Sequence, residues 1–242
     1  MGEPPFTDPR VRQAMLYAIP HDRIIRTALA GRGARATCLH NPDDITCTNT
    51  YDRYKLDKAR ALLKEAGQPD VSFDFWYSNG LPYNNNNDIA ILIADQLKSI
   101  GVTAKLRPTP PVQMLDAMRA RINGADQAMS GMFLNESVIW LNDPSTLTNS
   151  SVASKGPASG SGNWARFSDR EVDELHFKYR NSADAAGRKA AYARIQEKVA
   201  DSASTINPLI VLGRTIVTSP KISGVTFSQD PYARYAHLKP KS

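Results

Sequence analysis

The sequence lacks the segments and motifs that mark a membrane protein or an enzyme. Its longest apolar runs, such as residues 89–94, are far too short to cross a bilayer, so we expect no transmembrane helix. It contains no phosphate-binding loop with its lysine, no Rossmann glycine fingerprint and no HExxH helix. Its four histidines stand singly, and none has a sequence-near partner for acid–base chemistry. We therefore expect a protein that is not an enzyme and needs no cofactor.

Cysteine is scarce, and the position of the two cysteines is the best indication of cellular compartment. Cys38 and Cys47 lie in one short loop, TCLHNPDDITC, between two predicted helices. A disulfide that closes so short a loop stabilises a fold by roughly 2 to 3 kcal/mol, and such bonds persist in oxidising compartments. We favour this disulfide and a periplasmic location. The alternatives are two unpaired surface thiols, or a metal site of Cys38, His40 and Cys47, whose spacing matches no common zinc pattern.

Positive charge is in moderate excess, with a formal net charge of +6. The densest basic cluster is formed by Arg23, Arg26, Arg32 and Arg35, on one predicted helix and the loop after it. A nucleic-acid-binding surface needs more lysines with aromatic residues between them. We interpret the cluster as a solvated helix face and expect no nucleic-acid partner.

The order of the predicted helices and strands indicates an α/β fold. The 242 residues are enough to bury a sizeable core. Helix signals cover residues 9–19, 21–30, 56–66, 88–100, 112–122, 168–180 and 183–202. Strand signals cover residues 71–77, 102–108, 126–132, 206–213 and 214–219. Because strands and helices alternate from the first strand to the third, we expect a sheet with largely parallel pairing.

Local sequence signals predict where two of the helices begin and where a long loop lies. Thr7 or Asp8 is the expected N-cap of the first helix, with proline at its first position. Ser168 and Glu171 have the spacing of a capping box and predict the start of a later helix. Residues 134–162 are rich in Asn, Ser, Gly and Thr without periodicity, so we expect a long loop there, of the functional or mobile kind.

The residues that follow the predicted strands are the candidates for ligand binding. In open α/β sheets, ligands bind outside the carboxyl ends of the strands. The aromatic, amide and acidic side chains gathered there are Tyr77, Asn79, Phe133, Asn135, Glu136 and Trp140. The alternative is that Phe133 and Trp140 simply cover the edge of the sheet.

Five segments together resemble a known family. They are PPFTDPRVRQAMLYAI, KLDKARALLKEAGQPD, IADQLKSIGVTAKL, WLNDPSTL and NWARFSDREVDEL. In order and spacing they resemble the carboxy-terminal half of bacterial extracellular solute-binding proteins of family 5. These are the dipeptide, oligopeptide, nickel and opine receptors of ABC importers. The resemblance spans nearly all of residues 4–235.

The resemblance implies one lobe of a type II periplasmic-binding-protein-like clamshell, with a mixed sheet flanked by helices. Residues 1–7 are then the hinge-side segment, residues 8–218 the substrate-binding lobe, and residues 219–242 a tail that returns to a first lobe. It also implies a small-molecule or peptide ligand bound between the lobes and an ABC permease as partner. The parent protein is expected to be secreted or lipid-anchored, with its signal outside this chain.

One departure from the family pattern bears on the ligand. In the peptide-binding members, an aspartate that anchors the ligand's ammonium precedes an acidic residue followed by proline. Here that pair is Asp143-Pro144, and Trp140 stands where the aspartate is expected. A buried ammonium needs a carboxylate or dense hydrogen bonding, although Glu136 is close enough in sequence to replace it. We therefore expect an opine, a sugar conjugate or another polar metabolite rather than an ordinary free-amine peptide.

Two other functions compete with this interpretation. The chain is alternatively a standalone ligand- or protein-interaction domain that reuses the lobe, for instance as a homodimer. A hydrolase is the least favoured function, because its nucleophile and base would have to lie in residues 134–162, which contain no histidine.

Overall fold

A three-stranded parallel sheet organises the first half of the fold. The computed structural model describes residues 3–40, 46–80, 85–122, 129–135, 143–154, 162–203, 206–212, 217–227, 233–234 and 237–240. The strands of the sheet are β2 (Val71–Ser78), β3 (Val102–Thr109) and β4 (Met132–Leu134), in the order β3-β2-β4. Both pairings are parallel, as the alternation of strands and helices predicts.

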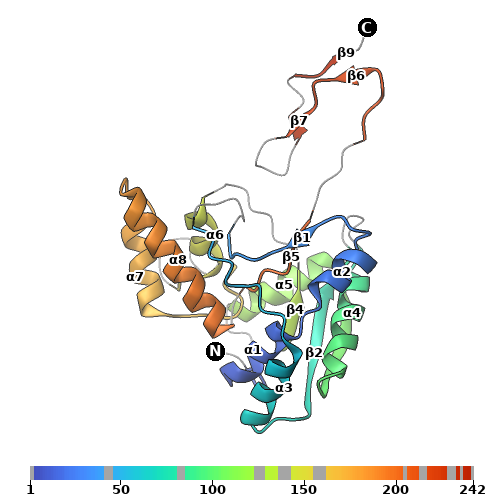
Figure 1. Ribbon diagram of the computed structural model, residues 1–242, viewed down its shortest axis with the longest axis vertical. Coiled ribbons are helices and arrows are strands. Elements are labelled where there is room, and N and C mark those ends of the chain that lie inside the picture. The colour runs from blue at the N-terminus through green and yellow to red at the C-terminus, as the bar shows by residue number, and fades with distance from the viewer. Residues whose placement is uncertain are drawn as a thin grey trace.

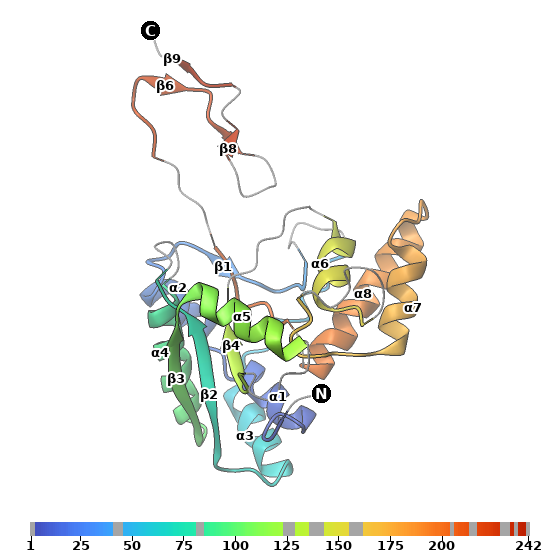
Figure 2. The same cartoon turned by 180° about the vertical axis from the view of Figure 1, so that it is seen from behind.

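Alternating apolar residues make β2 the centre of the first core. Val71, Phe73, Phe75 and Tyr77 share one face of this strand and are buried, as their spacing predicts. They pack with α1 (Pro9–Tyr17), α3 (Leu56–Glu65) and α4 (Asn86–Lys98). On the other face of the sheet lies α5 (Pro111–Ile122), which Figure 2 shows in front of β2 and β3.

A second core lies among the helices of the other half of the chain. These are α6 (Pro144–Ser151), α7 (Arg170–Tyr179) and α8 (Ala185–Ser202), with α7 and α8 side by side in Figure 1. Its buried residues are Leu39, Tyr51, Leu147, Val152, Phe167, Val172, Tyr192, Ile195, Val199 and Ala200. The segment that carries the two cysteines thus supplies side chains to this helical core.

Short elements complete the fold. After α2 (His21–Thr27), β1 (Ala34–Arg35) pairs antiparallel with β5 (Ile210–Val211). The antiparallel pairs in the tail are β6 (Ile222–Ser223) with β9 (Lys239–Pro240), and β7 (Thr226–Phe227) with β8 (Ala233–Arg234). Figures 1 and 2 show these tail strands standing away from both cores. None of the helices that the structure describes is long and apolar enough to span a membrane.

The structure confirms one predicted helix start and corrects another. Asp8 is the N-cap of α1, and its carboxylate accepts a hydrogen bond from the backbone N–H of Arg10 at 2.8 Å. The capping box at Ser168 is wrong, because Asp169 caps α7 by accepting from the N–H of Val172 at 3.1 Å. The Glu171 carboxylate instead bonds side chains of α8.

Several predicted segments differ from the structure, and the strand expected over residues 206–213 is limited to Ile210–Val211 in the described residues. The third strand begins only at Met132 where residues 126–132 were expected, and residues 126–128 lie outside the described part. In the expected loop over residues 134–162, α6 forms because Asp143 caps it and accepts from the N–H of Ser145 at 2.7 Å. Of the last expected strand, residues 217–219 are not in a strand and the rest lies outside the described residues.

Candidate ligand-binding cavity

A cavity of about 330 Å³ lies along the outer edge of β4, between the two cores. Its walls come from residues 131–135, from α1, and from residues 51, 53, 162, 164, 165, 203 and 206–209. Cavities of this size accept small ligands in many proteins. The position at the carboxyl end of a parallel strand is the one expected for a ligand site in an α/β fold.

Gly131 allows β4 to approach β2 closely enough to form this wall. Its φ is +114°, and a Cβ atom built there would lie 2.1 Å from the backbone oxygen of Asp74. The approach is also held by the indole of Trp76, whose Nε1 donates to the Ser130 oxygen at 2.7 Å. Only glycine combines this backbone conformation with the close contact.

Two arginines hold the carboxyl end of α8 against the cavity. Arg12 Nε donates to the backbone oxygen of Ser202 at 2.8 Å, and Arg53 Nη1 donates to that of Ala200 at 3.3 Å. Arg53 Nη2 also pairs with Asp201 at 3.1 Å. Guanidinium groups satisfy the last carbonyls of a helix and suit the negative end of its dipole. Both cations line the cavity as a result.

Two buried polar residues of the lining each have one side-chain polar atom without a hydrogen-bond partner among the described residues. Tyr51 is 4% exposed, and its hydroxyl has no hydrogen-bond partner among the described residues. His21 is 6% exposed, and its Nδ1 has none either. Burial raises the pKa of the Tyr51 phenol and, together with the charge of Arg35, lowers the pKa of His21. Both groups are therefore neutral near pH 7.

The lining is largely apolar and contains no acidic side chain among the described residues. Its apolar members include Phe6, Met15, Leu16, Phe75, Met132 and Leu209. Its charged members are Arg12 and Arg53, with Asn135 and Asn207 as amides. An apolar pocket with a few polar groups is typical of small-molecule sites.

The structure brings together two of the residues expected to bind ligand. Phe133 and Asn135 both line the cavity. Glu136 and Trp140 lie outside the described residues. The candidates from the first strand are not in the described lining: Asn79 is exposed at the same end of the sheet, where its N–H donates to the Thr109 oxygen at 3.0 Å.

Tyr77 occupies the core instead of a ligand-facing surface. It is 3% exposed, and its hydroxyl donates to Asn87 Oδ1 at 2.8 Å. Its position on the apolar face of β2 determines this outcome, because successive side chains of a strand point to opposite faces. We therefore leave Tyr77 out of the proposed site.

No local pattern in the sequence points to the arginines and the tyrosine of the cavity. Arg12 lies on a predicted amphipathic helix and Tyr51 in the loop of the cysteines. Their joint position depends on α8, whose carboxyl end follows Arg12 by 190 residues. Apolar periodicity carries no signal for such a contact, although an arginine on the apolar half of a helix is a reason to look for one.

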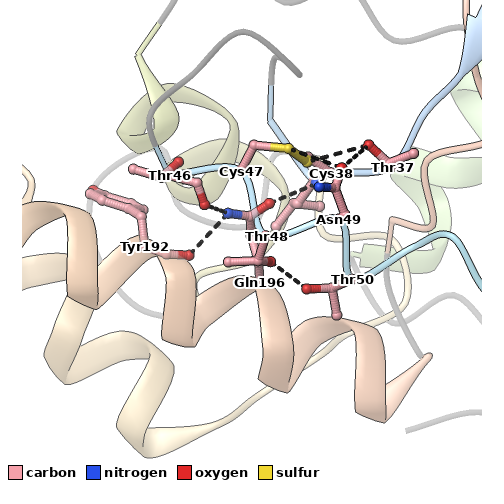
Figure 3. Close-up of a disulfide and its surroundings, with 10 residues drawn as sticks. Thr37, Cys38, Thr46, Cys47, Thr48, Asn49, Thr50, Tyr192 and Gln196 are labelled. Carbon is pink, nitrogen blue, oxygen red and sulfur yellow. Dashed lines mark hydrogen bonds between the residues drawn. A yellow bond between two sulfur atoms is a disulfide. The ribbon is translucent and has the colours of Figure 1, made fainter.

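Cys38 and Cys47 are joined by a disulfide, with their Cα atoms 5.4 Å apart. Figure 3 shows the Gln196 side chain of α8 beside this bond. Gln196 Oε1 accepts from the N–H of Leu39 at 3.0 Å, and its Nε2 donates to the Thr46 oxygen. The disulfide excludes the metal site of Cys38, His40 and Cys47, since both sulfurs are committed. No other cluster of metal-ligating side chains occurs in the described ranges.

Comparison with known proteins identifies relatives of this chain. A family model described as "Bacterial extracellular solute-binding proteins, family 5 Middle" matches residues 1–159. Glutathione-binding protein GsiB of Escherichia coli (strain K12) is 27% identical over 238 residues, which cover 93% of this chain and 44% of GsiB.

Solved structures are similar over most of this chain. The dipeptide binding protein from Pseudoalteromonas sp. SM9913, in complex with Met-Leu, has a TM-score of 0.77 and 23% sequence identity. The match covers 99% of this chain and 46% of the Pseudoalteromonas chain. The substrate binding protein CtaP from Listeria monocytogenes has a TM-score of 0.70 and 27% sequence identity. The match covers 85% of this chain and 41% of the CtaP chain.

These matches confirm the resemblance and the fold class. The α/β arrangement with a parallel sheet corresponds to part of periplasmic binding protein structures, and this chain spans less than half the length of the relatives named above. The family consists of non-enzymatic solute-binding proteins, in agreement with the expectation that the chain is not an enzyme. Because the family model matches well over half of the residues, the chain belongs to family 5 of the bacterial extracellular solute-binding proteins.

Proposed function

We propose that this chain is the carboxy-terminal lobe of a periplasmic receptor that delivers a small polar solute to an ABC permease. The cavity at the carboxyl end of β4, lined by Phe133 and Asn135, is the observation that carries the proposal. The length of the relatives, about twice that of this chain, supports a second lobe. The disulfide supports an oxidising compartment.

In this proposal the chain divides into three parts. Residues 1–7 form the hinge side, residues 8–218 form the lobe that bears the cavity, and residues 219–242 return to the first lobe. The tail supports this division, since Val217 is 91% exposed and Ile222 is 37% exposed. Apolar side chains at that exposure are stabilised when another surface covers them.

The ligand in this proposal is a peptide-like or opine-like metabolite without a free ammonium at the cavity. The ligands in the names of the relatives, glutathione and the dipeptide Met-Leu, support small peptide-like solutes in general. Two features of this chain favour a different member of that class. Trp140 replaces the expected aspartate, and no Asp or Glu is among the described residues of the lining. An ammonium group buried there would have no carboxylate partner among the described residues of the lining.

Calorimetry of the full-length polypeptide that contains this chain tests the function and the ligand class together. The panel comprises Met-Leu, N-acetyl-Met-Leu, glutathione and an opine such as octopine. We expect micromolar or tighter binding of at least one blocked or opine-type solute and weak binding of Met-Leu. Micromolar binding of Met-Leu would overturn the ligand class, and absence of binding across the panel would count against the receptor function.

The isolated 242-residue chain provides a second test. One wall of a cleft contributes only part of the buried ligand surface, so we expect its affinity to be at least about 100-fold weaker than that of the full-length protein. Nanomolar affinity of the isolated chain for a small solute would contradict a half-site. Size-exclusion chromatography with light scattering, run on the same sample, reveals whether a homodimer closes the cavity instead.

A further inference from the structure

Asn79 stands at the exposed end of β2 with an unbonded side-chain amide. It directly follows Ser78, the last residue of the strand. Its backbone N–H donates to the Thr109 oxygen at 3.0 Å, which holds the main chain at this position against β3. Its side chain makes no hydrogen bond with any described residue. The carboxamide of Asn79 is therefore open to reaction.

The residue after Asn79 is a glycine with open space around it. Gly80 is exposed, its φ is +91°, and a Cβ atom built there would have nothing within 4 Å. Its N–H donates no hydrogen bond to any described residue. Because glycine has no Cβ, its backbone rotates freely and its nitrogen is easily approached. Nothing in the described part of the chain therefore keeps the Gly80 nitrogen from the Asn79 carboxamide.

Other asparagines of the chain lack one of these conditions. Asn163 is 5% exposed, and its carboxamide makes three hydrogen bonds, to the oxygens of Val152 and Phe167 and from the Phe167 N–H. Asn181 is exposed and makes no side-chain hydrogen bond within the described ranges, but a serine follows it. Among the described residues, only Asn79 combines exposure and an unbonded amide with a following glycine.

We propose that Asn79 is a deamidation site, where intramolecular attack by the next residue converts the side-chain amide into a carboxylate. The Gly80 nitrogen loses its proton and bonds Cγ of Asn79, and the amide nitrogen leaves as ammonia, which gives a succinimide. Water then opens this ring. Breaking the bond from Cγ to the Gly80 nitrogen gives aspartate, and breaking the bond from the main-chain carbonyl carbon gives isoaspartate. The net reaction consumes water, releases ammonia and needs no other reactant.

The reaction changes the carboxyl end of the sheet and leaves β2 in place. The pairing of β2 with β3 ends at Ser78 and Thr109, and the Asn79 N–H that bonds Thr109 precedes the altered linkage. Isoaspartate lengthens the main chain by one carbon between residues 79 and 80. Both products lower the formal net charge of +6 by one. The chain thus gains a negative charge with age at the end of the sheet that bears the cavity, whatever solute the cavity binds.

Ageing of the full-length polypeptide at pH 8 tests the site. Peptide mapping by mass spectrometry follows the mass gain of replacing NH₂ by OH, and separates Asn79 from the second Asn-Gly pair, residues 123–124, which lies outside the described residues. A synthetic peptide of residues 74–83 is the reference. Because the segment is exposed and unbonded, we expect Asn79 to react within about 10-fold of the peptide rate. A slower rate than that would overturn the site. Aspartate without isoaspartate would overturn the succinimide route.

Three variants locate the reaction. Asn79→Gln should abolish the mass gain at residue 79, because the longer side chain closes a less favourable ring. Gly80→Ala should slow the reaction by about 10-fold, since a Cβ then stands beside the attacking nitrogen. Asn181→Gln is the matched control, because Asn181 is exposed and has no glycine after it, and it should leave the rate at Asn79 unchanged. Far-UV circular dichroism verifies folding. An unchanged rate in folded Gly80→Ala would contradict attack by the nitrogen of residue 80, and the comparison with the peptide keeps the test decisive if that variant does not fold.

Discussion

The backbone N–H of Leu39 donates to the Oε1 of Gln196 over 3.0 Å, across 157 residues of chain. The same carboxamide donates through Nε2 to the backbone oxygen of Thr46, so one side chain of α8 holds both ends of the disulfide segment. Gln196 is fully buried in this arrangement. Tyr51 follows Cys47 by four positions and lines the cavity, so the contact lies close in sequence to one wall of the cavity.

Replacing Gln196 by leucine removes both hydrogen bonds while keeping a side chain of similar size. The N–H of Leu39 then stays buried without its acceptor and the Thr46 oxygen loses the bond from Gln196, so we expect a loss of about 2 to 4 kcal/mol in the free energy of unfolding. Urea unfolding measures it. Gln96→Leu is the control, because the Gln96 carboxamide bonds only the exposed Ser99 hydroxyl. Equal stability of Gln196→Leu and the parent would show that Gln196 does not hold the segment.

The disulfide should stabilise the helical half of the fold. It closes a loop with a sequence separation of 9, so the chain-entropy model gives about 2 to 3 kcal/mol. We expect the double variant Cys38→Ser/Cys47→Ser to lose this amount in urea unfolding. A reductant should destabilise the parent by a similar amount and leave the double variant unaffected. If the reductant lowers the stability of both equally, its action lies elsewhere.

His176 should make the stability depend on pH. It is fully buried, with Nδ1 3.2 Å from the Tyr192 hydroxyl and Nε2 3.3 Å from Asn149 Oδ1. Burial, and next the charge of Arg180, lowers the pKa of His176 to about 4. Because the unfolded state has the higher pKa, near 6.5, it binds the proton first as the pH falls. The stability is therefore complete above pH 6.5 and is lost progressively toward pH 4.

The variant His176→Gln isolates this contribution. From pH 7 to pH 5 the pKa difference corresponds to a loss of about 2 kcal/mol in the parent, and the variant should lack this part. The burial of His21 also lowers its pKa, but its contribution is present in both proteins and cancels in the comparison. Urea unfolding at the two pH values measures the difference. Parallel losses in parent and variant would contradict a neutral buried His176.

Local patterns predict the sheet well and the cavity poorly. The alternation in Val71–Ser78 determines both the strand and its buried face, because a period of two leaves no other way to bury these residues. The helix Pro144–Ser151 is different, since its sequence TLTNSS has no apolar period. Its first turn depends on Asp143, which also accepts hydrogen bonds from Arg188 at 2.6 Å. That contact joins residues 45 apart, which no local pattern encodes.

The candidate site shows the same division between local and long-range information. The position of Phe133 and Asn135 after a parallel strand is a consequence of the βαβ order, and both line the cavity. The arginines depend on the end of α8, where Ala203, in the left-handed conformation with φ of +47°, is the C-cap. Only the assembled fold brings Arg12 to the backbone oxygen of Ser202 and Arg53 to that of Ala200.

Gly131 is the residue on which the wall of the cavity depends most directly. A Cβ at this position would lie 2.1 Å from the Asp74 oxygen, so alanine forces β4 away from β2 in addition to straining a φ of +114°. We expect Gly131→Ala to lose at least about 2 kcal/mol of stability and to weaken solute binding by the full-length protein. Urea unfolding and calorimetry measure the two effects.

Gly80→Ala separates backbone strain from the steric contact at Gly131. Gly80 also has a positive φ, +91°, but a Cβ there would have nothing within 4 Å. Its substitution should therefore cost only the conformational strain, about 1 kcal/mol, because no neighbour has to move. Equal losses in the two variants would mean that the close approach of β4 to β2 contributes nothing. A larger loss in Gly131→Ala, accompanied by weaker solute binding, ties the shape of the cavity to this single contact between Gly131 and Asp74.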